Sequence, residues 1–307
     1  MKLTDKEKYM RLCQDEPSIP LYLQDWWLNC VCGAPFWDVL LYENDKGAIL
    51  AAMPVYTPCK GVISMPPFTQ SMGIWCEACP KQAITAYFVR QLPPTKSFFV
   101  NFLSSFTDWQ PFYWEGYKQT TRYNYIMPLM TSHEFMWKNL SENIRRNIQK
   151  AHKKFNITIQ KNVPVDAFLQ LNAMVYARQK KKAPALSVLK TVIEQALKRE
   201  QGAIWGAYDA GNKLHAAVFC AWQSERAYYI AAGVDTQFRN SGAQTAVLWQ
   251  VIQDVSGQAK TFDFCGSMIP GIAHFFQQFG ATQTPYFTIS KGTLDVWLRL
   301  KRKFLKI

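Results

Sequence analysis

Apolar positions along the chain recur with helical spacing in some stretches and gather into short strand-like runs in others. In the second half, two helix patterns lead to three runs rich in aromatic and aliphatic residues, Ala203–Tyr208, Leu214–Trp222 and Ala227–Ala232, with short polar turns between them. Such a pattern predicts three antiparallel strands. A helix, a strand, a further helix and a last strand follow, and the first half repeats this order more loosely. The sequence therefore predicts two copies of one α/β unit.

This repeated order sets the expected domain organisation. The pattern restarts around Met127–Ser132, so we expect two tandem domains, 1–130 and 131–307, in a chain of 307 residues. The predicted fold class is α/β (α+β), with a mixed, mostly antiparallel sheet flanked by helices in each domain. The final residues, LDVWLRLKRKFLKI, predict a basic amphipathic helix that either packs on the body of the protein or lies on an anionic membrane surface.

The stretch Arg226–Ile252 joins a strand, a polar turn and a helix. We expect Gly233 to end the strand and Asp235–Ser241 to form the turn, before a helix that begins near Ala243. A turn that leads into a helix directs several backbone N–H groups and the positive end of the helix dipole at one point. This arrangement predicts a site for an anion such as a pyrophosphate, with an ordinary strand-to-helix connection as the alternative.

Charge and cysteine content narrow the class of protein. A formal net charge of +13 favours anionic partners, such as a CoA phosphate, RNA or an acidic lipid surface. The eight cysteines are scattered, as expected of a cytoplasmic protein. Cys76 and Cys79 form a CxxC pair without the second pair that a structural zinc site needs, so we predict no metal site. No apolar run is long enough to span a membrane.

Aromatic residues are dense between positions 109 and 125. Such a cluster is either a platform for a sugar or a base, or part of the core or a domain interface. Its members are Trp109, Phe112, Tyr113, Trp114, Tyr117, Tyr123 and Tyr125.

The second half also contains phrases in an order that resembles a known superfamily. They read LSENIRRNIQKAHK at 140–153, AYYIAAGVD at 227–235, GAQTAVLWQVI at 242–252, FDFCGS at 262–267 and GIAHFFQQFGATQTPYFTISK at 271–291. In this order and spacing the chain resembles the GNAT acyltransferases. More narrowly, it is similar to their two-domain Fem-type branch, the FemABX peptidoglycan aminoacyltransferases, and to CelD-like proteins.

The resemblance implies a splayed sheet in which the acyl group of the donor lies between two parted strands. It places the donor pyrophosphate on the turn Gln237–Ala243, because Arg239–Gln244 matches part of the phrase [QR]xxGx[GA]. Acetyl-CoA or another acyl-CoA is the implied co-substrate. The expected cofactor-binding residues are Gly233, Val234, Arg239, Asn240, Ser241, Gly242 and Ala243.

The implied chemistry is direct attack of a substrate amine on an activated carbonyl, which needs proton transfer and N–H donors for the oxyanion. Phe276 stands where the family carries a titratable Tyr or Lys. Asp263, His274 and Tyr229 are therefore the expected catalytic residues. Asp263 alternatively caps the turn that follows its strand, and His274 alternatively is an exposed histidine without a role.

The acceptor is expected to meet a different set of side chains. Arg145 and Arg146 open a basic helix and suit a phosphate or carboxylate, although a solvated helix face explains them equally. Tyr228 and Tyr229 alternate across their strand, so one of them should face the cleft. Tyr228 and Ser267 complete the expected substrate-binding set.

These observations lead to one function and two alternatives. We expect an N-acyltransferase that moves an acyl group from an acyl-CoA-type donor to an amine of a sugar, peptide or cell-envelope precursor. The first alternative is an aminoacyl-tRNA-dependent transferase acting on a peptidoglycan peptide, with tRNA as partner. The second is a non-catalytic binding protein that keeps a degenerate GNAT fold.

Overall fold

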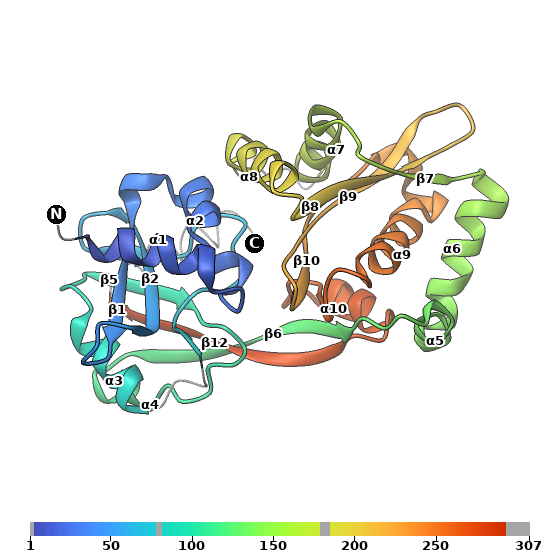
Figure 1. Ribbon diagram of the computed structural model, residues 1–307. Helices are drawn as coiled ribbons and strands as arrows, with labels where there is room; N and C mark the ends of the chain where they lie inside the picture. Colours follow the sequence, from blue (N-terminus) through green and yellow to red (C-terminus); the bar gives the residue numbers. More distant parts are fainter. Residues whose placement is uncertain (1–2, 78–81, 179–184, 293–307) are drawn as a thin grey trace. The chain divides into compact units, whose positions relative to one another are not determined.

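The computed structural model describes residues 3–77, 82–178 and 185–292 (Figure 1). The chain divides into two compact units, Met1–Arg122 with Pro285–Ile307 and Tyr123–Thr284. The predicted C-terminal helix lies outside the described residues. None of the described helices has the length and apolar character that a membrane-spanning segment requires.

Unit 1 contains a sheet in the order β1-β2-β3-β5-β12, with β4 paired to β2. All described pairings of these strands are antiparallel except β3 with β5. Helices α1, α2 and α3 pack against β1. The elements are α1 (Asp5–Asp15), η1 (Leu21–Leu23), α2 (Asp25–Cys32), η2 (Ala34–Phe36), β1 (Trp37–Glu43), β2 (Ile49–Cys59), β3 (Val62–Ser64), β4 (Trp75–Cys76), α3 (Gln82–Gln91), β5 (Ser97–Asn101) and α4 (Gln110–Trp114).

Unit 2 repeats this plan with the strand order β6-β11-β10-β9-β8-β7. Here β10 and β11 form the parallel pair, and the other described pairings are antiparallel. The elements are β6 (Lys118–Pro128), α5 (His133–Asn139), α6 (Glu142–Phe155), β7 (Thr158–Lys161), α7 (Val165–Arg178), α8 (Leu186–Lys198), β8 (Gly202–Tyr208), β9 (Leu214–Trp222), β10 (Arg226–Val234), η3 (Thr236–Ser241), α9 (Ala243–Val255), β11 (Thr261–Asp263), α10 (Pro270–Gln277) and β12 (Thr282–Gly292).

The predicted fold class is confirmed: each unit has a mixed, mostly antiparallel sheet with flanking helices. The two halves exchange their last strands, however. β6 follows α4 in the first half but pairs with β11, and β12 follows α10 in the second half but pairs with β5. The compact units therefore differ from the expected linear division at residue 130, since each half of the sequence supplies a strand to the other sheet.

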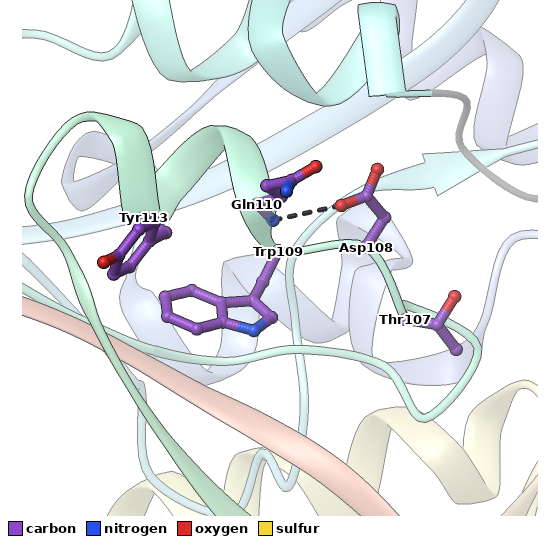
Figure 2. Close-up of a pocket in the computed structure, with 5 residues that line it drawn as sticks. All are labelled: Thr107, Asp108, Trp109, Gln110 and Tyr113. Atoms are coloured by element: carbon purple, nitrogen blue, oxygen red, sulfur yellow. Dashed lines mark hydrogen bonds between the residues drawn. The ribbon is translucent and has the colours of Figure 1, made fainter.

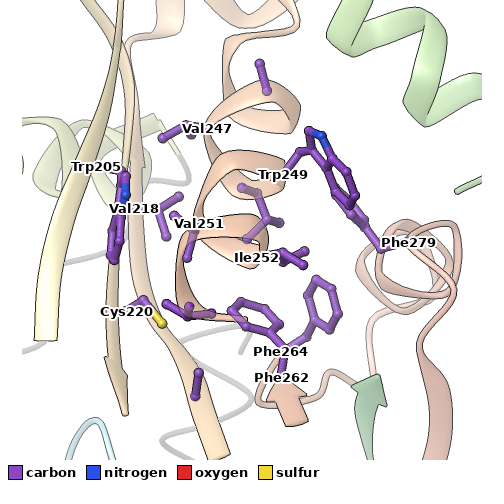
Figure 3. Packing of buried hydrophobic residues seen from close by; sticks show 14 of the residues in the cluster. Trp205, Val218, Cys220, Val247, Trp249, Val251, Ile252, Phe262, Phe264 and Phe279 are labelled. Atoms are coloured by element: carbon purple, nitrogen blue, oxygen red, sulfur yellow. The ribbon is translucent and has the colours of Figure 1, made fainter. Parts of the chain in front are cut away.

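Helix α9 lies at the centre of the core of unit 2. Figure 3 shows Val247 and Val251 facing Val218 and Cys220 of β9, while Trp249 points toward Phe279. On the other face of β8–β10 lie α7 and α8 (Figure 1). Helix α6 begins at a side-chain N-cap: the hydroxyl of Ser141 accepts a hydrogen bond from the Ile144 N–H.

Candidate active site

The two parallel strands of unit 2 part after a short pairing. β10 pairs with β11 only from Arg226 to Tyr228, after which β11 ends at Asp263 while β10 continues to Val234. Among the described residues, no strand pairs with β10 beyond Tyr228 on that side. The pairing of β10 with β9 also shifts between Tyr229 and Ala231, which marks a β-bulge. A bulge bends a strand and redirects its side chains, and here it falls where the strands separate.

The turn between β10 and α9 is a 3₁₀ helix rather than the open polar turn that we expected. Two of its N–H groups are bonded within the turn. The Gln237 N–H donates to the Asp235 carboxylate at 2.9 Å, and the Ala243 N–H donates to the Ser241 hydroxyl at 3.2 Å. The N–H groups of Gly242, Gln244 and Thr245 have no acceptor among the described residues. Unbonded N–H groups at the first turn of a helix attract an anion.

The prediction that Gly233 ends the strand is wrong. Gly233 lies inside β10, where a Cβ would come within 2.5 Å of Leu171 Cβ and 2.6 Å of the Asn172 nitrogen of α7. The absence of a side chain therefore lets α7 pack directly on the strand. Position 242 requires a glycine for a similar reason. Gly242 adopts φ +79°, and a Cβ there would overlap the Asn147 carbonyl oxygen of α6.

Tyr229 lies at the parting of the strands. Its ring packs edge-on against Phe276 of α10 with 6.0 Å between centroids. Burial raises the pKa of Tyr229 to about 12, an effect that the Gln244 contact partly offsets. The phenol is therefore protonated at neutral pH.

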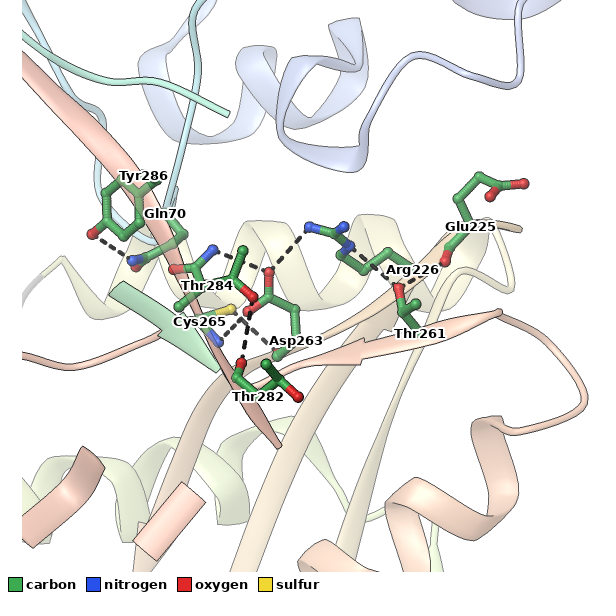
Figure 4. Close-up of polar contacts among 10 residues, drawn as sticks. Gln70, Glu225, Arg226, Thr261, Asp263, Cys265, Thr282, Thr284 and Tyr286 are labelled. Atoms are coloured by element: carbon green, nitrogen blue, oxygen red, sulfur yellow. Dashed lines mark hydrogen bonds and ion pairs between the residues drawn. The ribbon is translucent and has the colours of Figure 1, made fainter. Parts of the chain in front are cut away.

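Asp263 is almost fully buried at the end of β11, with an exposed fraction of 1% (Figure 4). Its carboxylate accepts hydrogen bonds from Cys265 N at 2.8 Å, Asn124 Nδ2 at 3.2 Å and an Arg226 guanidinium nitrogen at 3.4 Å. Burial raises its pKa to about 6, against the opposing charge of Arg226. These contacts join β6, β10 and β11 at the point where the strands part.

The other expected catalytic and acceptor residues occupy different environments. Tyr228 is buried, and burial raises its pKa. His274 is exposed on α10, and the Ser267 hydroxyl accepts a hydrogen bond from the Ile269 N–H just before that helix. Val234 is the last residue of β10. Arg239 and Asn240 are exposed on the turn.

The basic helix α6 packs against both η3 and α9. Arg146 forms an exposed ion pair with Glu142 at 3.8 Å, and an Arg145 guanidinium nitrogen lies 3.4 Å from the Lys138 carbonyl. The expected basic helix therefore lies beside the turn. The backbone carbonyl of Asn147, from the same helix, is the group closest to the position of a Cβ on Gly242.

The sequence did not indicate Asn172 as a site residue. Its amide nitrogen donates to the Ala232 carbonyl of β10 at 2.7 Å, and its amide oxygen is buried without a partner among the described residues. The sequence signal was weak, because Asn172 is one of several polar residues of α7, together with Asp166 and Gln170.

Comparison with known proteins agrees with this geometry. The model of the acetyltransferase (GNAT) domain family matches residues 138–277. Among solved structures, FemX superposes with a TM-score of 0.69 over 94% of this chain and 96% of its own, at 11% identity. L-PGS from Bacillus licheniformis gives 0.53 over 87% and 89%, also at 11% identity. No curated protein sequence gives a significant match.

At these identities the structural matches concern the fold, while the family match concerns the domain itself. The predicted resemblance is confirmed on both counts. Residues 138–277 match the GNAT acetyltransferase domain family, which supports a transferase, and the chain has the fold of FemX.

Proposed function

We propose that this protein transfers an acyl group from an acyl-CoA, with acetyl-CoA the simplest case, to an amine. The parting of β10 and β11 carries this proposal, because β10 leads directly into the turn whose unbonded N–H groups open α9. One end of the parting would thus anchor a pyrophosphate, and the acyl arm would lie along the unpaired edge of β10. Gly242, Gln244 and Thr245 would supply the anchoring N–H groups, with Arg239 and Asn240 exposed beside them.

Tyr229 is the residue that we propose as the acid. The amine nitrogen forms a bond to the carbonyl carbon, the carbon–sulfur bond breaks, and the leaving thiolate takes the proton of the Tyr229 hydroxyl. Its ring contacts Phe276, the position where the family carries a titratable side chain, so β10 supplies the hydroxyl that α10 lacks. Exposed His274 is the candidate that accepts the proton of the amine.

Asp263 takes a supporting role in this proposal. Because it is buried and bonded by three donors, we assign it the positioning of β6, β10 and β11 rather than the direct proton acceptance that the sequence predicted. Arg145 and Arg146, on the helix that packs against the turn, would pair with anionic groups of the acceptor.

The proposed acceptor is an amine of a sugar, peptide or cell-envelope precursor. Support for this proposal comes from the fold, which the chain shares with FemX and L-PGS. A cytoplasmic location and a peripheral contact with anionic lipid through residues 294–307 stay predictions.

Calorimetry with acetyl-CoA and longer acyl-CoAs tests the donor. We expect saturable binding of the donor that weakens as the salt concentration is raised, because the anchor is electrostatic. The Arg239→Ala variant should bind the donor at least severalfold more weakly or not at all. Absence of binding to any acyl-CoA would overturn the proposal. Binding of aminoacyl-tRNA alone, with a much steeper salt dependence, would instead support the alternative donor.

Tyr229→Phe removes the proposed acid and keeps the ring. We expect the rate of acyl transfer to fall by about 10²-fold or more, with donor affinity unchanged, in a spectrophotometric assay of released CoA thiol. Tyr125→Phe is the matched control, since the Tyr125 ring also lies 6.0 Å from Phe276 but comes from β6. Equal rates for the two variants would remove Tyr229 from the mechanism.

A further inference from the structure

The aromatic cluster between positions 109 and 125 divides into two parts in the structure. Phe112 and Tyr117 are buried in the core of unit 1, where their rings lie 5.2 Å apart. Tyr113 and Trp114 are instead exposed by 62% and 59% of their surfaces. Aromatic rings at a solvated surface raise the question of a ligand, because the core does not need them there.

A pocket of about 370 Å³ lies at this exposed part (Figure 2). Its described lining consists of Thr107, Asp108, Trp109, Gln110 and Tyr113. The Trp109 and Tyr113 rings meet edge to face, with 5.5 Å between centroids and 80° between planes, and so form two walls of a corner. The volume is near the lower end of the roughly 300–1,000 Å³ of small-molecule sites, which suits one or two rings.

The polar groups of the pocket are held in place and keep unused bonding capacity. One oxygen of Asp108 accepts a hydrogen bond from the Gln110 N–H at 3.0 Å, and the Gln110 amide oxygen accepts one from Gln82 of α3 at 2.9 Å. The second Asp108 oxygen and the Gln110 NH₂ group therefore point to no partner among the described residues. A fixed carboxylate acceptor next to a fixed amide donor complements hydroxyl groups, which donate and accept at once.

We propose that this pocket binds a neutral sugar ring. The C–H groups of one sugar face carry partial positive charge and suit the negative face of an aromatic ring, while the ring hydroxyls meet Asp108 and Gln110. A phosphorylated ligand fits less well, because the described lining holds a carboxylate and neither Lys nor Arg. A quaternary ammonium ion would need ring faces arranged around it, whereas Trp109 and Tyr113 contact each other.

The site is independent of the proposed acyl transfer, since all its described residues belong to unit 1. The test therefore uses the full chain and two readouts. Saturation-transfer NMR and calorimetry follow glucose, N-acetylglucosamine and cellobiose, with uridine and tetramethylammonium as comparison probes. Acyl-CoA binding is measured on the same samples.

Trp109→Ala should weaken sugar binding by about tenfold or more, because aromatic contacts dominate such sites. Asp108→Asn should weaken it severalfold. Trp114→Ala is the control, since Trp114 is the last residue of the adjoining helix α4, is 59% exposed and does not line the pocket. All variants should bind acyl-CoA as the unmodified protein does.

Three results would overturn the assignment: no binding of any of the sugars, equal sugar binding by Trp109→Ala and Trp114→Ala, or binding of uridine or tetramethylammonium in place of sugar. If Trp109→Ala loses its circular dichroism signature of folding, Tyr113→Ala decides, because a side chain 62% exposed is removed without disturbing the core. Failure of acyl-CoA binding with intact sugar binding would count against the proposed function alone.

Discussion

A single buried carboxylate, Asp263, gives the most direct residue-scale prediction. Its pKa is near 6 in the folded protein, against an ordinary value of 3.8. Between these values the folded state holds a proton that the unfolded state has already released, so stability falls as pH rises through this window. The free energy of unfolding of the unmodified protein, taken relative to that of Asp263→Asn, should fall by roughly 2–3 kcal/mol between about pH 4 and 6. Above this range the difference between the two proteins should stay constant.

Urea unfolding at a series of pH values measures this difference. Asp166→Asn is the control, because its carboxylate pairs with Lys190 at the surface and is 76% exposed. A difference between the unmodified protein and Asp263→Asn that stays constant from pH 4 to 6 would show that Asp263 is not titrating in a buried environment.

Residue types and their order along the chain predicted Tyr229 and Asp263 as site residues, but not the side chains around them. Gln244, in the first turn of α9, affects the pKa of Tyr229 in the bulged part of β10, and this proximity depends on a helix direction that no local pattern specifies. The contact between Asn124 and Asp263 likewise spans 139 positions. Such pairs arise from sheet topology, which the sequence pattern left open.

The approach of α6 to the turn before α9 leads to a prediction at the scale of elements. Gly242 has φ +79° and faces the Asn147 carbonyl, so Gly242→Ala should cost roughly 2–4 kcal/mol from left-handed backbone strain and overlap. It should also weaken donor binding, because relief of the overlap moves α6 or the turn. Gly257→Ala, which places no atom within 4 Å of the added Cβ, should change stability and donor binding little. Unfolding midpoints that coincide for the two variants would contradict this account.

The elements themselves were largely predictable. Hydrophobic spacing located α9 and the three strands β8 to β10 within a few residues, because each carries a run of apolar residues that the core buries. Gly233 was misassigned for a physical reason: a glycine that admits a packed helix has the same local appearance as one that ends a strand. Only the neighbouring α7 distinguishes the two.

Strand exchange is the feature of the whole molecule that the sequence did not reveal. Hydrophobic periodicity predicts that β6 and β12 are strands but does not predict the sheet in which each of them pairs. The apolar face of a strand can be buried against either core. The expected division at residue 130 therefore assigned each half its own last strand, whereas β12 pairs with β5 and β6 with β11.

This exchange predicts that the two units unfold together. Ile289 of β12 is fully buried and pairs with Val100 of β5, and Leu248 of α9 is fully buried in unit 2. Ile289→Ala and Leu248→Ala should each cost roughly 2–5 kcal/mol and should lower the midpoint of one shared thermal transition. In scanning calorimetry the measured enthalpy should equal the van't Hoff enthalpy for the unmodified protein and both variants. The expected reason is that a strand held by one sheet and continuous with the other must lose both pairings before either unit can unfold fully. Two separate transitions, with each variant shifting only one, would show instead that β6 and β12 do not couple the units.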